Sequence, residues 1–110
     1  MKIAIASSDG KNVDLHFGKA NSIYVYYFDG ENSKFIEHRT VEIDLNERHQ
    51  WTKVLDVISD CDIIMSAQTG FKSKYGIEKA GLKSFEVKGP IETVLKKYID
   101  HYKFMNDIII

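Results

Sequence analysis

The chain has 110 residues, of which 44% are hydrophobic and 12% aromatic, and its formal net charge at pH 7 is −1. The length and apolar content predict one folded, soluble domain over residues 1–110 and exclude a disordered chain. The near-neutral charge disfavours a nucleic-acid-binding protein, and because no stretch approaches the roughly 18 apolar residues of a membrane span, we expect a cytoplasmic protein.

The first half of the chain predicts strands separated by turns. Residues 2–6 form an apolar run closed by Asp9-Gly10, a pair that favours a hairpin with a brief returning strand over 12–15. Two further strands are predicted over 22–28 and 34–43. The apolar and polar residues of the second one fall out of alternation near its middle, which predicts a bulge or a bend.

In the second half the period changes from strands to alternating helices and strands. Apolar residues recur at i, i+3, i+4 and i+7 from Trp51, which predicts a helix. A later helix is weaker, because Gly76 interrupts it, and it ends at Gly81 in a position that favours left-handed backbone. The predicted elements are a helix over 51–58, a buried strand over 63–67, a helix over 71–80, a strand over 83–87 and a helix opened by Pro90.

This order predicts an α/β fold, with a partly parallel sheet and helices packed on its faces. The chain ends in three isoleucines, Ile108–Ile110, which would be a liability if exposed. They are expected to pack on the sheet edge or to pair with another chain, so the protein is a monomer or a weak homodimer.

The common enzyme motifs are missing from the sequence. It contains no phosphate-binding glycine loop, no His-Glu-x-x-His and no Gly-x-Ser-x-Gly. Asp9, Asp14, Asp29 and Asp44 fall at strand ends or turns, where acids are common for local reasons. A two-metal hydrolytic site, and with it a nuclease, is therefore not supported.

Among the four histidines, His16 has the most suggestive setting. His38, His49 and His101 are expected at the surface, and no two histidines have a recognised metal-ligand spacing. His16 lies in a turn before Gly18, and loops placed by a rigid sheet are where binding residues concentrate. It is either an ordinary loop histidine or a ligand for a transition metal.

The single cysteine, Cys61, excludes an intrachain disulfide and a cysteine-rich metal cage. Two interpretations remain for it, a small core hydrophobe or a soft metal ligand. The flanking acids Asp60 and Asp62 disfavour a thiolate, which makes the structural role the stronger interpretation.

Residues 71–88 carry five lysines against two glutamates, a local excess of three positive charges. This stretch is either an ordinary solvated surface or a binding surface for a small anionic ligand.

Three segments together resemble a known family. They are the opening strand with Ser7-Ser8-Asp9-Gly10, the run from Val13 through His16-Phe17-Gly18-Lys19-Ala20, and Asp60-Cys61-Asp62-Ile63-Ile64. With the closing Gly-Pro-Ile-Glu helix they resemble the dinitrogenase iron–molybdenum cofactor biosynthesis family, which includes NifX, NafY and the C-terminal domain of NifB. The resemblance covers nearly the whole chain, and His-Phe-Gly is its most specific part.

The resemblance implies a ribonuclease-H-like three-layer sandwich, with a mixed five-stranded sheet flanked by helices. It also implies a non-enzymatic protein that transiently binds an iron–sulfur or iron–molybdenum-type cluster, with metallocofactor assembly proteins or a recipient apo-enzyme as partners. His16 is then the candidate metal ligand and Cys61 a weaker one. The remaining predicted cofactor-binding residues are Phe17, Gly18, Lys19, Lys72 and Lys74.

The chain departs from the family pattern at residues 67–74, where many members have a small glycine-rich turn. This departure leaves a second function open. The chain would then be a small regulatory or protein-interaction module of the same fold that no longer binds a cluster.

Overall fold

The structure is a computed structural model, and it describes residues 1–44, 46–48 and 50–109. His49, predicted at the surface, and the side chains of the Ile108–Ile110 tail lie outside the described residues. No helix in the described part of the chain is both long and apolar enough to cross a membrane.

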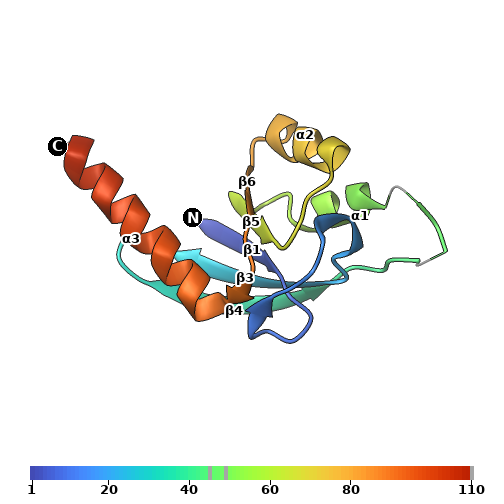
Figure 1. The fold of residues 1–110 in the computed structure, drawn as a ribbon, viewed down its shortest axis with the longest axis horizontal. Coiled ribbons are helices and arrows are strands. Elements are labelled where there is room, and N and C mark those ends of the chain that lie inside the picture. Colours follow the sequence, from blue (N-terminus) through green and yellow to red (C-terminus); the bar gives the residue numbers. More distant parts are fainter. Residues whose placement is uncertain (45, 49, 110) are drawn as a thin grey trace.

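A mixed five-stranded sheet forms the centre of the molecule (Figure 1). Its middle strand β1 is buried on both faces, since its isoleucines and alanines are fully excluded from solvent. It pairs antiparallel with β3 and parallel with β5. The edge strands β4 and β6 pair with β3 and β5, respectively. In sheet order the strands are β4 (Ser33–Thr40), β3 (Ser22–Phe28), β1 (Lys2–Ala6), β5 (Ile63–Ser66) and β6 (Lys83–Glu86).

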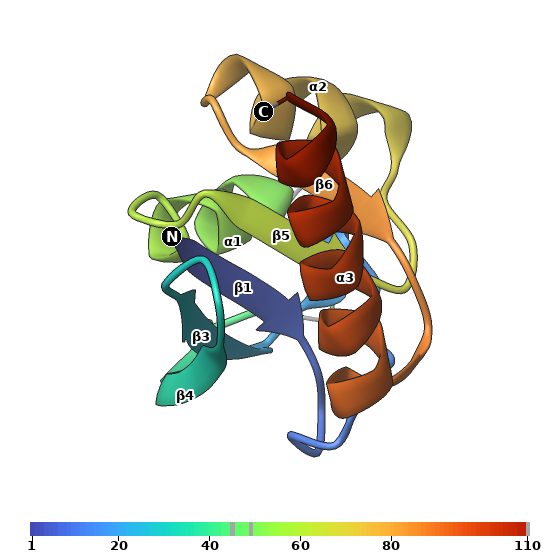
Figure 2. The same cartoon turned by 90° about the vertical axis from the view of Figure 1, so that its left-hand side faces the viewer.

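Three helices cover the two faces of this sheet. Helices α1 (Trp51–Val57) and α2 (Phe71–Lys79) pack on the face that presents Ala4 and Ala6 of β1. Helix α3 (Ile91–Ile109) lies on the opposite face of the sheet (Figure 2). It packs there through an apolar stripe. The α/β fold, the mixed five-stranded sheet and the flanking helices are thus confirmed, as is the three-layer arrangement.

The predicted hairpin after Asp9-Gly10 is wrong. The short strand β2 (Asn12–Val13) pairs with β7 (Gly89–Pro90), not with β1, because β3 and β5 already occupy both edges of β1. The Asp9 carboxylate instead accepts the backbone N–H groups of Lys11 and Asn12 at 2.8 and 2.9 Å, and these hydrogen bonds lower the pKa of Asp9 to about 2. These bonds close a turn over residues 9–12, a few residues before His16.

Two other predictions concern strand and helix ends. The strand predicted over 34–43 ends at Thr40, and the irregularity predicted in it is confirmed as a register shift opposite Val25 and Tyr26. Gly81 has a φ of +91°, as the predicted left-handed helix end requires.

Candidate functional site

His16 lies just beyond the sheet edge where the parallel strands β1 and β5 end. Its backbone is extended, with φ −68° and ψ 142°, and it forms an isolated parallel bridge with Gln68. Phe17 N–H donates to the carbonyl oxygen of Gln68 at 2.8 Å, and Ala67 N–H donates to that of Leu15 at 2.9 Å. The carboxyl ends of parallel strands are where α/β proteins commonly bind ligands.

The short helical turn that follows His16 explains why its side chain is exposed. Phe17 begins the short 3₁₀ helix η1 (Phe17–Lys19), and its ring is fully buried in the core under α1 and α2. Lys19 N–H closes the turn by donating to the carbonyl oxygen of His16 at 3.1 Å. Phe17 therefore anchors the turn in the core, while His16 and Lys19 remain on its solvent side.

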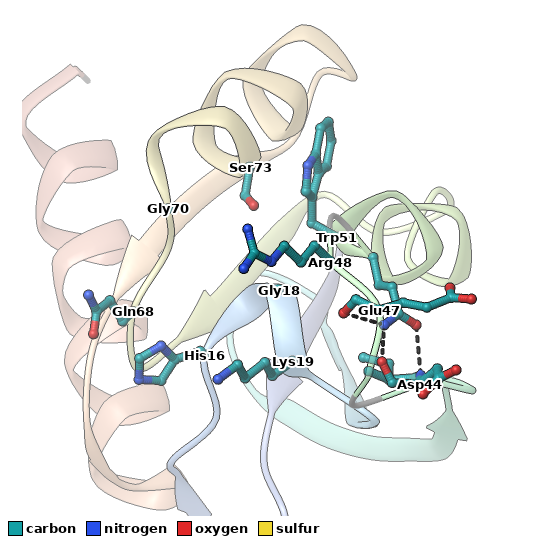
Figure 3. A pocket seen from close by; sticks show the side chains of 12 residues that line it. His16, Gly18, Lys19, Asp44, Glu47, Arg48, Trp51, Gln68, Gly70 and Ser73 are labelled. Carbon is teal, nitrogen blue, oxygen red and sulfur yellow. Dashed lines mark hydrogen bonds between the residues drawn. The ribbon is translucent and has the colours of Figure 1, made fainter.

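A hollow of about 660 Å³ opens beside His16 (Figure 3). It is bounded by η1, by the segment before α1 and by the first turn of α2. The side chains that give it its chemical character are His16, Lys19, Arg48, Trp51, Gln68 and Ser73.

Positive and negative charges occupy different parts of this hollow. Lys19 and Arg48 extend into the space between His16 and Ser73, whereas Asp44 and Glu47 lie to one side of it (Figure 3). The Asp44 carboxylate accepts the backbone N–H of Asn46 at 2.9 Å. The part of the hollow nearest His16 is therefore suited to an anionic ligand.

The segment that carries Arg48 is held by a buried glutamine. The Gln50 side-chain oxygen accepts the N–H of Asp44 at 2.7 Å, and its amide nitrogen donates to the carbonyl oxygen of Glu47 at 3.1 Å. Gln50 is itself almost fully buried. These bonds tie Gln50 to Asp44 and Glu47, which also line the hollow.

The structure brings together three of the predicted site residues, His16, Gly18 and Lys19. Phe17 belongs to the core instead, and Lys72 and Lys74 are exposed on α2 without lining the hollow.

Sequence reasoning missed nine of the twelve described residues that line the hollow, and the four of these that matter most for its chemistry are Arg48, Trp51, Gln68 and Ser73. Arg48 lies in a stretch without periodicity, so the sequence gives no signal for it. Gln68 and Ser73 fall within residues 67–74, the segment where the chain departs from the family pattern, and that departure was the available signal.

Cys61 lies at the other end of β5, before the strand begins, and the structure does not bring it to His16. Its side chain is 5% exposed, and its sulfur lies 3.7 Å from Asp60 Oδ1 and 3.9 Å from Arg39 Nη1. Burial first, and the Asp60 carboxylate second, raise the pKa of the Cys61 thiol to about 11. A buried neutral thiol is a poor metal ligand, so these observations favour the structural role.

The raised pKa predicts slow alkylation of Cys61. With its pKa at about 11 instead of 9.0, the thiol forms about a hundredfold less thiolate at pH 8, and burial slows attack further. Iodoacetamide labelling followed by mass spectrometry should therefore be at least about a hundredfold slower for the native chain than for the chain in urea. Equal rates would show an accessible, reactive thiol.

The other chemistry-bearing side chains do not gather into a second centre. His38 is exposed and stacks on Tyr24, with 4.2 Å between ring centroids. His101 is exposed on α3. In the described part of the chain, no three histidine, cysteine, aspartate or glutamate side chains form a group that could hold a metal ion.

Comparison with known families and sequences gives a consistent result. The family model described as dinitrogenase iron–molybdenum cofactor matches residues 1–101. Protein NifX of Rhodobacter capsulatus is 30% identical over 97 residues, which are 82% of this chain and 61% of that protein. The FeMo cofactor biosynthesis protein NifB of Herbaspirillum seropedicae is 24% identical over 102 residues, which are 89% of this chain and 18% of that protein. The chain thus spans less than two thirds of these relatives.

Solved structures share the fold. The crystal structure of PH0822 superposes with a TM-score of 0.73 at 24% identity, covering 92% of this chain and 90% of that one. A putative dinitrogenase from Methanocaldococcus jannaschii superposes with a TM-score of 0.67 at 12% identity, covering 93% of this chain and 90% of that one.

Proposed function

The chain belongs to the dinitrogenase iron–molybdenum cofactor family, and from this premise we propose that it is an accessory protein that binds an iron–sulfur or iron–molybdenum-type cluster as cargo. The description of the family and the name of one relative, FeMo cofactor biosynthesis protein NifB, support a role in metallocofactor assembly. Its partners would be assembly proteins or a recipient apo-enzyme.

The observation that carries this proposal is the position of His16 in the hollow. Its side chain is exposed, and in the described part of the chain no hydrogen bond engages its ring. An imidazole whose ring nitrogens are not engaged in hydrogen bonds is a good ligand for iron. The backbone bridge to Gln68 and the buried Phe17 fix the turn that presents it.

A single protein ligand suits a protein that passes its cargo on. A preassembled cluster keeps its own sulfides, so His16 would complete its ligation without enclosing it. Lys19 and Arg48 would steady a net-negative cluster, each at roughly 1 kcal/mol or less because both are exposed. Binding of this kind is reversible, and no catalytic step is assigned to the pocket. Cys61, at the far end of β5, is left out of the proposed ligand set.

Anaerobic titration with isolated iron–molybdenum cofactor tests the proposal. The parent chain should co-elute with the cluster in gel filtration, and His16→Ala should weaken binding by at least about tenfold, the equivalent of one lost ligand bond of about 1.4 kcal/mol or more. His101→Ala is the matched control, since it removes an exposed histidine from α3 on the opposite face of the sheet. If His16→Ala binds as tightly as the parent, the ligand assignment is wrong.

A specific surface feature supports the second candidate function. Phe71 and Tyr75 are 90% and 64% exposed on α2, the helix whose first turn lines the hollow. Large exposed aromatic side chains are typical of protein-interaction surfaces. A parent chain that does not bind the cluster at all would favour a regulatory or protein-interaction module of the same fold.

A further inference from the structure

The first turn of α2 offers backbone donors that nothing in the described part of the chain accepts. Its N-cap residue is Gly70, which has no side chain to cap the helix. The first bond of the helix runs from Lys74 N–H to the carbonyl oxygen of Gly70 at 2.9 Å. The N–H groups of residues 71–73 precede that bond, and such groups, with the helix dipole behind them, attract anions.

Ser73 provides an independent sign of a ligand at this helix end. The residue is only 6% exposed and lines the hollow, yet its hydroxyl has no hydrogen-bond partner among the described residues. Because the described residues include no buried side-chain oxygen without a partner, the Ser73 hydroxyl must be accessible from the hollow, and its partner must come from whatever fills that space. The Ser73 hydroxyl is directed into the space where the Arg48 guanidinium group ends (Figure 3).

We propose that the first turn of α2, the Ser73 hydroxyl and the Arg48 guanidinium group form a binding site for a free tetrahedral oxyanion of the phosphate or sulfate type. The guanidinium fork matches two oxygens of such an ion, and the hydroxyl and the helix N–H groups donate to the others. The site goes beyond cluster binding, because its ligand is a small oxyanion and needs no histidine.

The acids around the site leave these donors available. The Oε1 atom of Glu86 accepts Thr69 N–H at 3.0 Å, one residue before the N-cap, and so leaves the N–H groups of residues 71–73 free. Asp44 and Glu47 lie on the other side of the hollow (Figure 3).

An NMR titration of the ¹⁵N-labelled chain, without any cluster, tests the site. Adding inorganic phosphate or sulfate at constant ionic strength, with chloride as the reference, should shift the amide signals of residues 71–73 saturably. Phenyl phosphate is the comparison that separates a free ion from a phosphoryl group on a larger ligand. Binding of inorganic phosphate but not phenyl phosphate is the expected result, and the reverse order would overturn the assignment to a free ion.

One substitution inside the site and one outside it sharpen the test. Arg48→Gln should weaken phosphate binding about tenfold, because one charge-assisted pair is lost. Lys72→Gln is matched to it, since it removes one positive charge from α2 at a residue that does not line the hollow. Equal weakening by both variants would show that general surface charge, not this site, attracts the ion.

Gly70→Asp gives the strongest contrast. A Cβ atom at Gly70 meets nothing within 4 Å and the φ angle is not in the left-handed region, so the variant should fold. Its carboxylate would accept the free N–H groups of the first turn, so the melting temperature should equal or exceed that of the parent. Phosphate binding should fall at least tenfold, because those N–H groups are no longer available to the ion. Gly70→Ala adds a methyl group without an acceptor and should weaken binding less than threefold. A Gly70→Asp variant that binds phosphate like Gly70→Ala would overturn the proposal, as would the absence of saturable shifts in the parent.

Discussion

Phe17→Ala should lower the free energy of unfolding by about 3–5 kcal/mol, the usual cost of removing a fully buried aromatic ring. Phe17 is 0% exposed and packs in the core cluster that joins β1 to α1 and α2. Truncation would lose the buried surface of the ring and leave a cavity that the surrounding helices fill only in part.

Urea unfolding followed by Trp51 fluorescence and by circular dichroism measures this loss. His16→Ala is the matched control, because the side chain of His16 is next to Phe17 in the sequence but exposed. Its truncation should change the free energy of unfolding by no more than about 0.5 kcal/mol. A loss below about 1 kcal/mol for Phe17→Ala would show that the turn is not anchored through this ring.

The pair of variants separates two roles within the His-Phe-Gly turn. His16→Ala should affect binding but not folding, whereas Phe17→Ala should affect folding and, through it, binding. Phe17 was predicted among the cofactor-binding residues because of its place in the motif, but its burial assigns it to positioning.

The sheet and its helices were predictable because their patterns are local and strong. Residues 3–6 of β1 are apolar and fully buried, and the helical spacing from Trp51 brings Val54 and Ile58 into the core. The partner of residues 12–13 was not predictable in this way. Asp-Gly favours a hairpin locally, but which strands occupy the edges of β1 is decided by the whole sheet.

The candidate site was predictable in part for a similar reason. His16, Gly18 and Lys19 are consecutive in a motif, so one stretch of sequence identifies them. Arg48 and Ser73 reach the same hollow from the loop before α1 and from α2, and their convergence arises only from the packing of those elements. Lys72 and Lys74 were predicted as site residues, but Ser73 between them is the residue that lines the hollow. Adjacent residues on a helix face different directions, and the sequence does not show which of them faces the hollow.

Gly76→Leu should destabilise the protein by up to about 2 kcal/mol, although leucine is a much better helix former than glycine. Gly76 lies inside α2, where the sequence suggests only a weakened helix. An ideal Cβ atom at this position would lie 2.4 Å from Trp51 Cζ3 and 2.8 Å from Cη2, so the indole ring of α1 occupies the place of a side chain.

The two contributions to the Gly76→Leu effect have opposite signs, and their sizes decide the result. The gain in helix propensity is about 1 kcal/mol, whereas forcing a side chain into an occupied space costs about 3 kcal/mol or less in most cores. The indole is the end of a side chain and can move, but Trp51 also lines the hollow, so its displacement would alter the pocket wall. Urea unfolding and the Trp51 emission spectrum should therefore change together. Gly70→Ala, at a position with open space, should leave both close to the parent's, and a Gly76→Leu variant more stable than the parent would show that the indole yields freely.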